Sequence, residues 1–192
     1  MNKIIILLVV VSLSSLFAAE EWQVIAEKRN DVTFLSKTPL LNFKGKTSSI
    51  DGYLYWLGDE PFSGANELYF EVDLNSVTTG IGKRDRDMRN DVLETSKWPT
   101  TYFKGSITNV KSVHVGNSRY QVTSKGILFI HGVEKEMTIH AEISTDGSFM
   151  QVTSTFSVFL KDYNIEAPGL VAFIKVAEEI KLSLSFSLAK QQ

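Results

Sequence analysis

The chain has 192 residues, of which 43% are hydrophobic and 22% are charged, as expected for a folded globular protein. Its formal net charge of −2 comes with no long basic stretch, which argues against a nucleic-acid-binding protein. The absence of cysteine excludes disulfides, a cysteine nucleophile and a cysteine-linked lipid anchor.

The first 19 residues predict a secretory signal peptide. Lys3 precedes an apolar run from Ile4 to Val11, and small residues end the segment at Ala18 and Ala19. The run is shorter than the about 20 residues that cross a bilayer, so we expect cleavage after Ala18 or Ala19, with a retained membrane anchor as the alternative. Residues 20–192 then form one exported domain with 19 basic and 22 acidic side chains. We expect it in the periplasm, with secretion as the alternative.

Strand patterns dominate the rest of the chain. Apolar and polar residues alternate in stretches such as "KLSLSFSLA" and "EMTIHAEIS", which is typical of antiparallel strands with one buried face. This pattern predicts an all-β fold, either a sandwich or a closed barrel. We expect about eight strands, in the ranges 22–28, 31–37, 43–57 (with a break), 66–75, 99–110, 119–130, 134–144, 150–160 and 175–188.

The inward faces of these strands carry many of the 12 phenylalanines. An eight-stranded barrel is wide enough either for packed side chains or for one small ligand, and periodicity does not separate these two cases. The inward residues that would line a cavity are Phe70, Val72, Leu74, Phe103, Ile139, Phe156, Val158, Leu184 and Phe186.

A dense charged segment interrupts the strands in "TTGIGKRDRDMRNDVLETSKWPTTYFKG", residues 78–105. It contains the only good helical candidate, a short helix near 84–94. One interpretation is a solvated turn that closes the barrel, with exposed ion pairs that each contribute about 0–1 kcal/mol. The other is a mouth at which arginine side chains bind a polar head group. In either case Arg84 and Asp85 are expected to pair and fix the loop.

No catalytic set and no metal site is predicted. His114, His131 and His140 show none of the short spacings of zinc ligands, and neither a nucleophile elbow nor a phosphate-binding loop is present. We therefore expect neither an enzyme nor a protein cofactor. His131 precedes Gly132 at a predicted tight turn, and we expect it to lie at the mouth of the barrel.

Four stretches in order resemble the YceI-like family of lipid- or polyisoprenoid-binding proteins. They are "VTFLSKTPLLNFKGKTSSIDGYLYW", "KRDRDMRNDVLETSKWPTTYFKGSI", "SKGILFIHGVEKEMTIHAEI" and "FSVFLKDYNIEAPGLVAFIKVAEEIKLSLSFSL". Together they cover about residues 22–188. The resemblance implies an extended lipocalin-like antiparallel barrel that holds an isoprenoid or quinone-type lipid.

The chain departs from the family at several polar positions. Asp87 stands where many members have histidine, Leu160 where many have arginine, and Asn164 replaces a glycine. A histidine of the second strand region is also missing. These changes leave the head group open and make a more neutral lipid credible.

The predicted function is a binding protein for an apolar lipid, with membrane contact during lipid exchange. Arg84, Arg86, Arg89 and His131 are the predicted head-group residues at the mouth, and the nine inward residues are the predicted cavity lining. Two alternatives stay open: a stress-related structural barrel with a packed core, and a non-catalytic accessory to quinone redox chemistry. The sequence does not determine the oligomeric state.

Overall fold

The computed structural model describes residues 19–26, 28–37, 42–58, 60–113, 118–166, 169–171, 174–175 and 177–191. Residues 1–18 of the predicted signal peptide and His114 lie outside the described residues. None of the helices in these ranges is long and apolar enough to cross a membrane.

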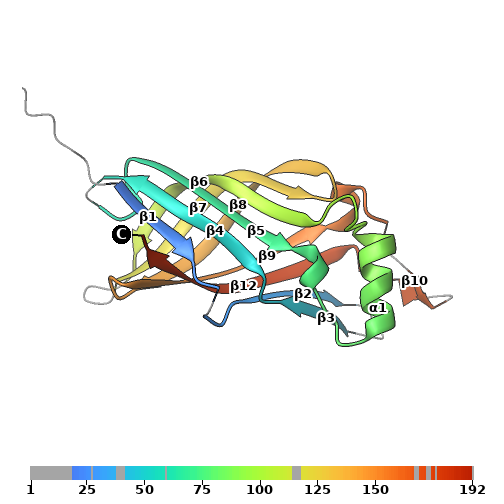
Figure 1. The fold of residues 1–192 in the computed structure, drawn as a ribbon. Helices are drawn as coiled ribbons and strands as arrows, with labels where there is room; N and C mark the ends of the chain where they lie inside the picture. Colours follow the sequence, from blue (N-terminus) through green and yellow to red (C-terminus); the bar gives the residue numbers. More distant parts are fainter. Residues whose placement is uncertain are drawn as a thin grey trace, which may run out of the picture.

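Antiparallel strands make up most of the molecule (Figure 1). They are β1 (Ala19–Val24), β2 (Asp31–Lys37), β3 (Asn42–Thr47), β4 (Ile50–Leu57), β5 (Ala65–Asp73), β6 (Thr100–Ser112), β7 (Ser118–Ile130), β8 (Val133–Thr145), β9 (Phe149–Phe159), β10 (Gly169–Val171), β11 (Ile174–Lys175) and β12 (Glu179–Lys190). The helical elements are η1 (Leu74–Ser76), α1 (Gly82–Asp87), η2 (Met88–Val92) and η3 (Leu160–Tyr163).

Eight strands close into a barrel, as predicted. Neighbouring strands follow the order β1-β4-β5-β6-β7-β8-β9-β12, and β1 pairs again with β12 through Trp22 opposite Lys190. β2 pairs with a different part of β12, and β3 then adds to the outer edge of β2. The predicted strand 43–57 is interrupted at residues 48–49, which divides it into β3 and β4. β3 pairs with β2 and β4 pairs with β1, and both of these strands are neighbours of β12.

The predicted helix is present but begins earlier and changes its winding. α1 continues directly into η2, a π-helical turn that ends with the Leu93 amide donating to the Met88 carbonyl at 2.9 Å. Figure 1 shows this segment lying across one end of the barrel, opposite the end that holds β1 and the C-terminus. We call these the helix end and the closed end.

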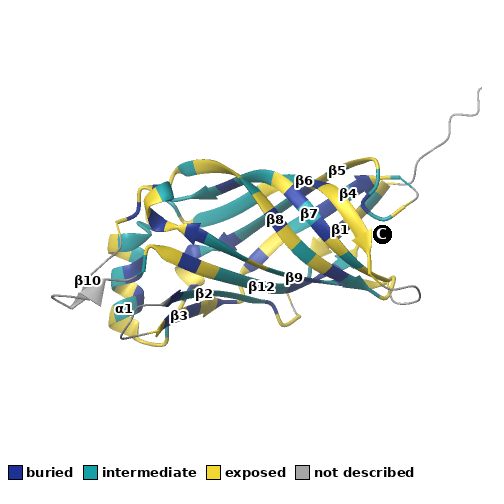
Figure 2. Cartoon of the chain, turned by 180° about the vertical axis from the view of Figure 1, so that it is seen from behind, coloured by how far each residue is buried: buried dark blue, intermediate teal, exposed yellow. Residues whose placement is uncertain are grey.

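Burial follows the alternation that the sequence predicted. Buried and exposed residues alternate along the strands of the wall, and α1 turns its buried side toward the barrel (Figure 2). In β3, for example, Phe43, Gly45 and Thr47 are buried, whereas Asn42, Lys44 and Lys46 are exposed. Period-two alternation therefore assigned the inward face correctly.

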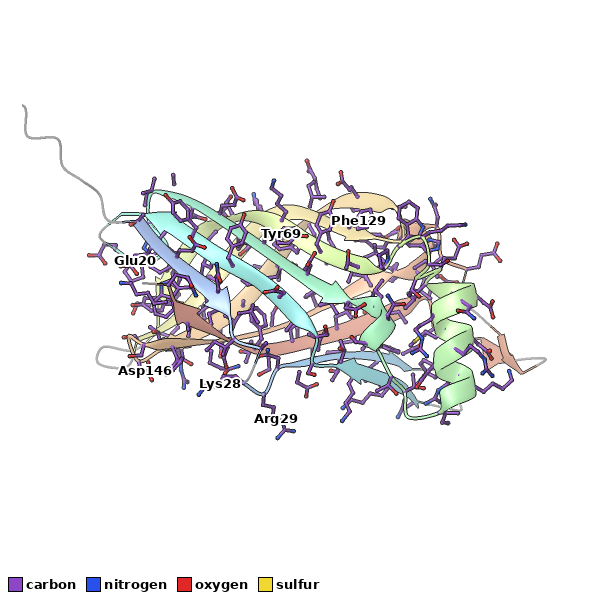
Figure 3. The ribbon with its side chains drawn as sticks, viewed as in Figure 1. Glu20, Lys28, Arg29, Tyr69, Phe129 and Asp146 are labelled. Carbon is purple, nitrogen blue, oxygen red and sulfur yellow. The ribbon has the colours of Figure 1, made fainter. Side chains whose placement is uncertain are left out.

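An aromatic ladder crosses the outside of the wall. Tyr69 stacks on Tyr53 and Tyr102, and Tyr102 stacks on Phe129 with ring centroids 4.8 Å apart. Tyr69 and Phe129 both lie on the outer face in Figure 3. Burial, followed by its hydrogen bond to Glu71, raises the pKa of Tyr69 to about 12. Such cross-strand pairs stabilise the sheet.

The pairing between β8 and β9 is incomplete. They pair from Ala141 opposite Ser154 to Thr145 opposite Met150. Toward the helix end the described residues 133–140 and 155–159 form no ladder with each other. Val133 and Met137 of β8 and Phe156 of β9 instead pack against one apolar cluster. We call this stretch the β8–β9 seam.

Candidate functional site

The barrel encloses a cavity of about 690 Å³. This volume is within the range of about 300–1,000 Å³ that is usual for small-molecule sites. All nine inward residues predicted from the sequence lie in its lining: Phe70, Val72, Leu74, Phe103, Ile139, Phe156, Val158, Leu184 and Phe186. That they contact a ligand stays a prediction.

The lining along the barrel is almost entirely apolar. Phe70 and Phe186 meet across the interior with ring centroids 4.9 Å apart. Phe34 lies flat against the wall over Gly45, where an added Cβ would come within 2.3 Å of the ring. The absence of a side chain at Gly45 thus lets the Phe34 ring lie against the wall, where it takes less space from the cavity.

An aromatic cluster fills the closed end. Trp22 stacks on Trp56 at 6.3 Å, Trp56 meets Phe62 at 5.1 Å, and Phe62 meets Tyr120 at 5.4 Å, all between ring centroids. Leu188, which has no exposed surface, belongs to the same cluster. These five residues are not among the described residues that line the cavity, so the cavity stops short of the closed end.

The helix end carries a cap with an apolar inner side and a charged rim. Met88, Val92 and Leu93 lie against the interior as part of the apolar clusters. Among the described residues, the charged side chains that line the cavity are all in this cap: Lys83, Arg84, Asp87 and Asp91. In this part of the chain, charge therefore reaches the cavity at the helix end.

Asp85 holds the cap in place from inside. It is 6% exposed and accepts hydrogen bonds from the Thr78 hydroxyl at 2.7 Å, the Thr79 amide at 2.7 Å and the Thr79 hydroxyl. Burial alone raises the pKa of Asp85, but these hydrogen bonds, with the charge of Arg89, outweigh it and hold the pKa below its ordinary value. The ionised carboxylate is thus the form that the fold stabilises.

Arg84 and Asp85 do not form the direct ion pair predicted from the sequence. Arg84 donates to the Thr79 hydroxyl at 2.7 Å and to the Thr79 carbonyl at 2.9 Å, so Thr79 joins the two side chains. The Arg84 guanidinium lies 4.4 Å from the centre of the Phe43 ring. Thr78 and Thr79 lie before the N-cap position, which is Ile81, so the usual helix start signal does not indicate their role.

The other predicted mouth residues lie outside the described cavity lining. Arg86 is exposed on α1, and Arg89 donates to the carbonyls of Asn75 and Val77 at 3.5 and 3.2 Å. Of the four residues predicted to bind a head group, only Arg84 lines the cavity. For Arg86 and Arg89 the head-group role stays a prediction.

His131 fastens the rim rather than lining the cavity. It and Gly132 have φ angles of 51° and 79°, which confirms the tight turn predicted there. Its Nδ1 lies 3.3 Å from the Tyr163 carbonyl, and its Nε2 lies 3.0 Å from a Glu94 carboxylate oxygen without hydrogen-bond alignment. The ring therefore connects three loops, and its head-group role also stays a prediction.

The described part of the chain contains no cluster of three or more side chains suited to hold a metal ion. The chemistry available in the cavity is apolar contact along the barrel, together with two basic and two acidic side chains at one end.

The sequence matches the family model for the YceI-like domain over residues 22–188. No curated protein matches it. Three solved structures share its fold. A polyisoprenoid binding domain from Saccharophagus degradans has a TM-score of 0.70 at 17% identity and covers 91% of this chain and 99% of its own. BcnA from Burkholderia cenocepacia has a TM-score of 0.67 at 17% identity, with coverage of 85% and 98%. The YCEI protein of Campylobacter jejuni has a TM-score of 0.58 at 18% identity, with coverage of 81% and 89%.

Proposed function

The chain belongs to the YceI-like domain family, and from this premise we propose that its barrel binds one long apolar lipid of the polyisoprenoid or quinone type. The activity is binding rather than catalysis. The observation that carries the proposal is an apolar cavity of about 690 Å³ with charged residues at its helix end.

Burial of the lipid tail supplies the affinity. Each buried methylene contributes about 0.8 kcal/mol, so a few isoprene units suffice without any strong polar contact. The aromatic and branched side chains of the lining, such as Phe70, Leu184 and Phe186, offer apolar contact along the tail. The Phe62–Trp56–Trp22 cluster closes the far end and limits how deep the tail enters.

The charged cap places the head group. Lys83 and Arg84 line the cavity together with Asp87 and Asp91, so the two signs nearly cancel. A polyphosphate head group requires an excess of basic side chains. The cap therefore favours a neutral or singly charged head, such as a hydroxyl or a quinone ring, over a diphosphate.

A fully packed barrel without a ligand is the competing function. A cavity of about 690 Å³ weighs against it, because packed interiors contain few voids larger than a water molecule. For the quinone accessory role, the described residues offer no feature beyond the cavity itself.

The proposed site of action is the periplasm, reached through the signal peptide at residues 1–19. Intact-mass measurement of protein from the periplasmic fraction tests this proposal. A chain that begins at Ala19 or Glu20 supports export, and an uncleaved chain in the membrane fraction contradicts it.

Mass spectrometry of an organic extract from gently purified protein tests the ligand. A stoichiometric polyisoprenoid or quinone would support the proposal and identify the tail. An empty extract, combined with a melting temperature that added polyprenol does not change, would refute it in favour of the packed barrel.

Variants of the lining test the cavity itself. Phe186→Glu places a charge in the interior and is expected to abolish polyprenol uptake. Phe159→Glu is the matched control, because Phe159 is 44% exposed on the outside of β9. Ala141→Phe fills part of the cavity without adding a charge. It tests the cavity independently if Phe186→Glu does not fold. Uptake that persists in folded Phe186→Glu and Ala141→Phe would refute binding inside the barrel.

A further inference from the structure

Ile81 stands out from the surface of the helix end. It is 54% exposed, the highest value for a large hydrophobic side chain among the described residues. Gly80 and Gly82 flank it, and a Cβ added to either glycine would meet nothing within 4 Å. Open space thus surrounds both glycines of the "GIG" tip. Because more than half of Ile81 is exposed, burial in the core does not account for this isoleucine.

Helix stability does not account for Ile81 either. The residue occupies the position just before α1 and makes no side-chain hydrogen bond to the helix. Serine, threonine, aspartate and asparagine are strongly preferred there, and isoleucine is among the poorest choices. The sequence thus forgoes a helix cap at this position and exposes an apolar side chain.

Basic residues surround the tip. Lys83 and Arg86 extend from α1, and Lys44 and Lys46 extend from β3, all four of them exposed. β3 lies beside the tip, because Lys46 and Thr78 exchange two backbone hydrogen bonds of 2.9 Å. We call Ile81 with these four residues the Ile81 corner.

Acidic residues near the corner offset only part of this charge. Asp87 pairs with Lys83 at 2.7 Å, and Asp91 is exposed one turn further along. Arg84, Asp85 and Arg89 are engaged inside the cap. The closed end carries charges of both signs, and Glu20 pairs there with Lys190 at 2.6 Å. Glu20 is labelled there in Figure 3, opposite α1.

We propose that the Ile81 corner docks on an anionic lipid bilayer, with Ile81 in the interface and the four basic residues against the lipid head groups. Ile81 and Lys83 also line the cavity, so docking turns its mouth toward the membrane. That the bilayer exchanges lipid with the cavity rests on the function proposed above. The docking itself does not.

One inserted side chain and a few basic residues give weak, reversible attachment. Membrane affinity scales with buried apolar area plus electrostatic attraction, and basic residues act within about a Debye length of the surface. Weak attachment suits a carrier that must leave the membrane again.

Sedimentation with vesicles tests the docking. The protein is purified after export, and its mass is checked so that no uncleaved leader contributes. Vesicles of phosphatidylglycerol and phosphatidylethanolamine are expected to bind it at least tenfold more tightly than phosphatidylcholine vesicles, and 0.5 M salt should remove the difference. Equal binding to both kinds of vesicle, or no binding to either, would overturn the proposal.

Variants locate the contact. Ile81→Asp and Lys44→Glu/Lys46→Glu are each expected to weaken binding to the anionic vesicles about tenfold or more. Val110→Asp and Lys125→Glu are the matched controls, on residues of β6 and β7 away from the cap, and should change binding less than twofold. Equal losses in the test and control variants would overturn the assignment of this corner.

Ile81→Asp also separates docking from folding. Since aspartate is a good helix cap, the melting temperature should stay the same or rise while vesicle binding falls. Vesicle binding by a wild-type protein that takes up no polyprenol would uphold the docking and refute the proposed cavity function. Uptake of detergent-solubilised polyprenol should be unaffected by Lys44→Glu/Lys46→Glu, because neither lysine is among the described residues that line the cavity.

Discussion

The two ends of the barrel are stabilised in different ways. At the closed end, Trp22, Trp56, Phe62 and Tyr120 form a chain of ring contacts. At the helix end, the cap is fixed by hydrogen bonds to Asp85 and leaves the cavity accessible beside it. The fold thus concentrates apolar packing at the closed end and uses polar contacts at the helix end, where we propose that the ligand enters.

Removing a ring from the closed end should produce the largest effect on stability. Trp56→Ala deletes a side chain that is 4% exposed and contacts both Trp22 and Phe62. We expect a loss of about 3–5 kcal/mol in the free energy of unfolding, measured with urea. Tyr53→Ala, on the outer face of the same strand, is the control and should cost clearly less. Similar losses would mean that the closed end is not the stable part of the barrel.

Ligand binding should act on the opposite end. At a free polyprenol concentration 100 times the dissociation constant, binding adds about 2.7 kcal/mol to the stability of the folded state. Because the ligand lies under the cap, amide hydrogen exchange should slow most in α1 and η2. Equal slowing in β1 and β4 at the closed end would contradict the contrast between the ends.

Asp85→Asn tests the polar fastening of the cap. The variant loses charged hydrogen bonds, and we expect it to cost about 1.5–3 kcal/mol near neutral pH. The pKa of Asp85 is lowered in the folded state, so its contribution is present above the unfolded pKa, about 3.9, and disappears as pH falls through the folded pKa. Urea unfolding of both proteins from pH 7 to pH 2 should therefore show the difference shrinking in acid. A constant difference would contradict the assigned role.

Trp22→Phe should be the smallest change and refines the description of the closed end. The indole Nε1 of Trp22 is buried without a hydrogen-bond partner in the described structure. Phenylalanine keeps an aromatic ring at this position and removes the unsatisfied donor, so part of the lost packing is recovered. We expect a change within about 1 kcal/mol in either direction, measured by urea unfolding beside Trp56→Ala. A loss as large as that of Trp56→Ala would show that the indole nitrogen has a partner.

The face of each strand was predictable, and the position of a residue along the barrel axis was not. Alternation placed Phe70 and Phe186 inward, because side chains on a strand point to opposite faces in turn. Trp56 and Leu188 are just as inward in the pattern, yet they fill the closed end instead of lining the cavity. That distinction depends on how far each residue lies from the closed end. The alternation of inward and outward side chains does not encode this distance.

The partners of the charged residues were also beyond the sequence. Opposite charges at neighbouring positions predicted a pair between Arg84 and Asp85, whereas both side chains bind Thr79. Neighbours on a helix point in different directions, and residues three or four apart meet instead. Two ion pairs within residues 78–105, Lys83 with Asp87 and Lys97 with Glu94, have these spacings.

The β8–β9 seam gives the barrel a mechanical property that a fully paired wall lacks. Near the closed end the circumference is fixed by hydrogen bonds, but along the seam it is set by side chains such as Met137 and Phe156. Apolar contacts slide and reform without a fixed register, so this part of the wall is compliant. If the barrel binds lipid as proposed, widening the seam would admit a bulkier or branched tail while every ladder of the barrel stays intact.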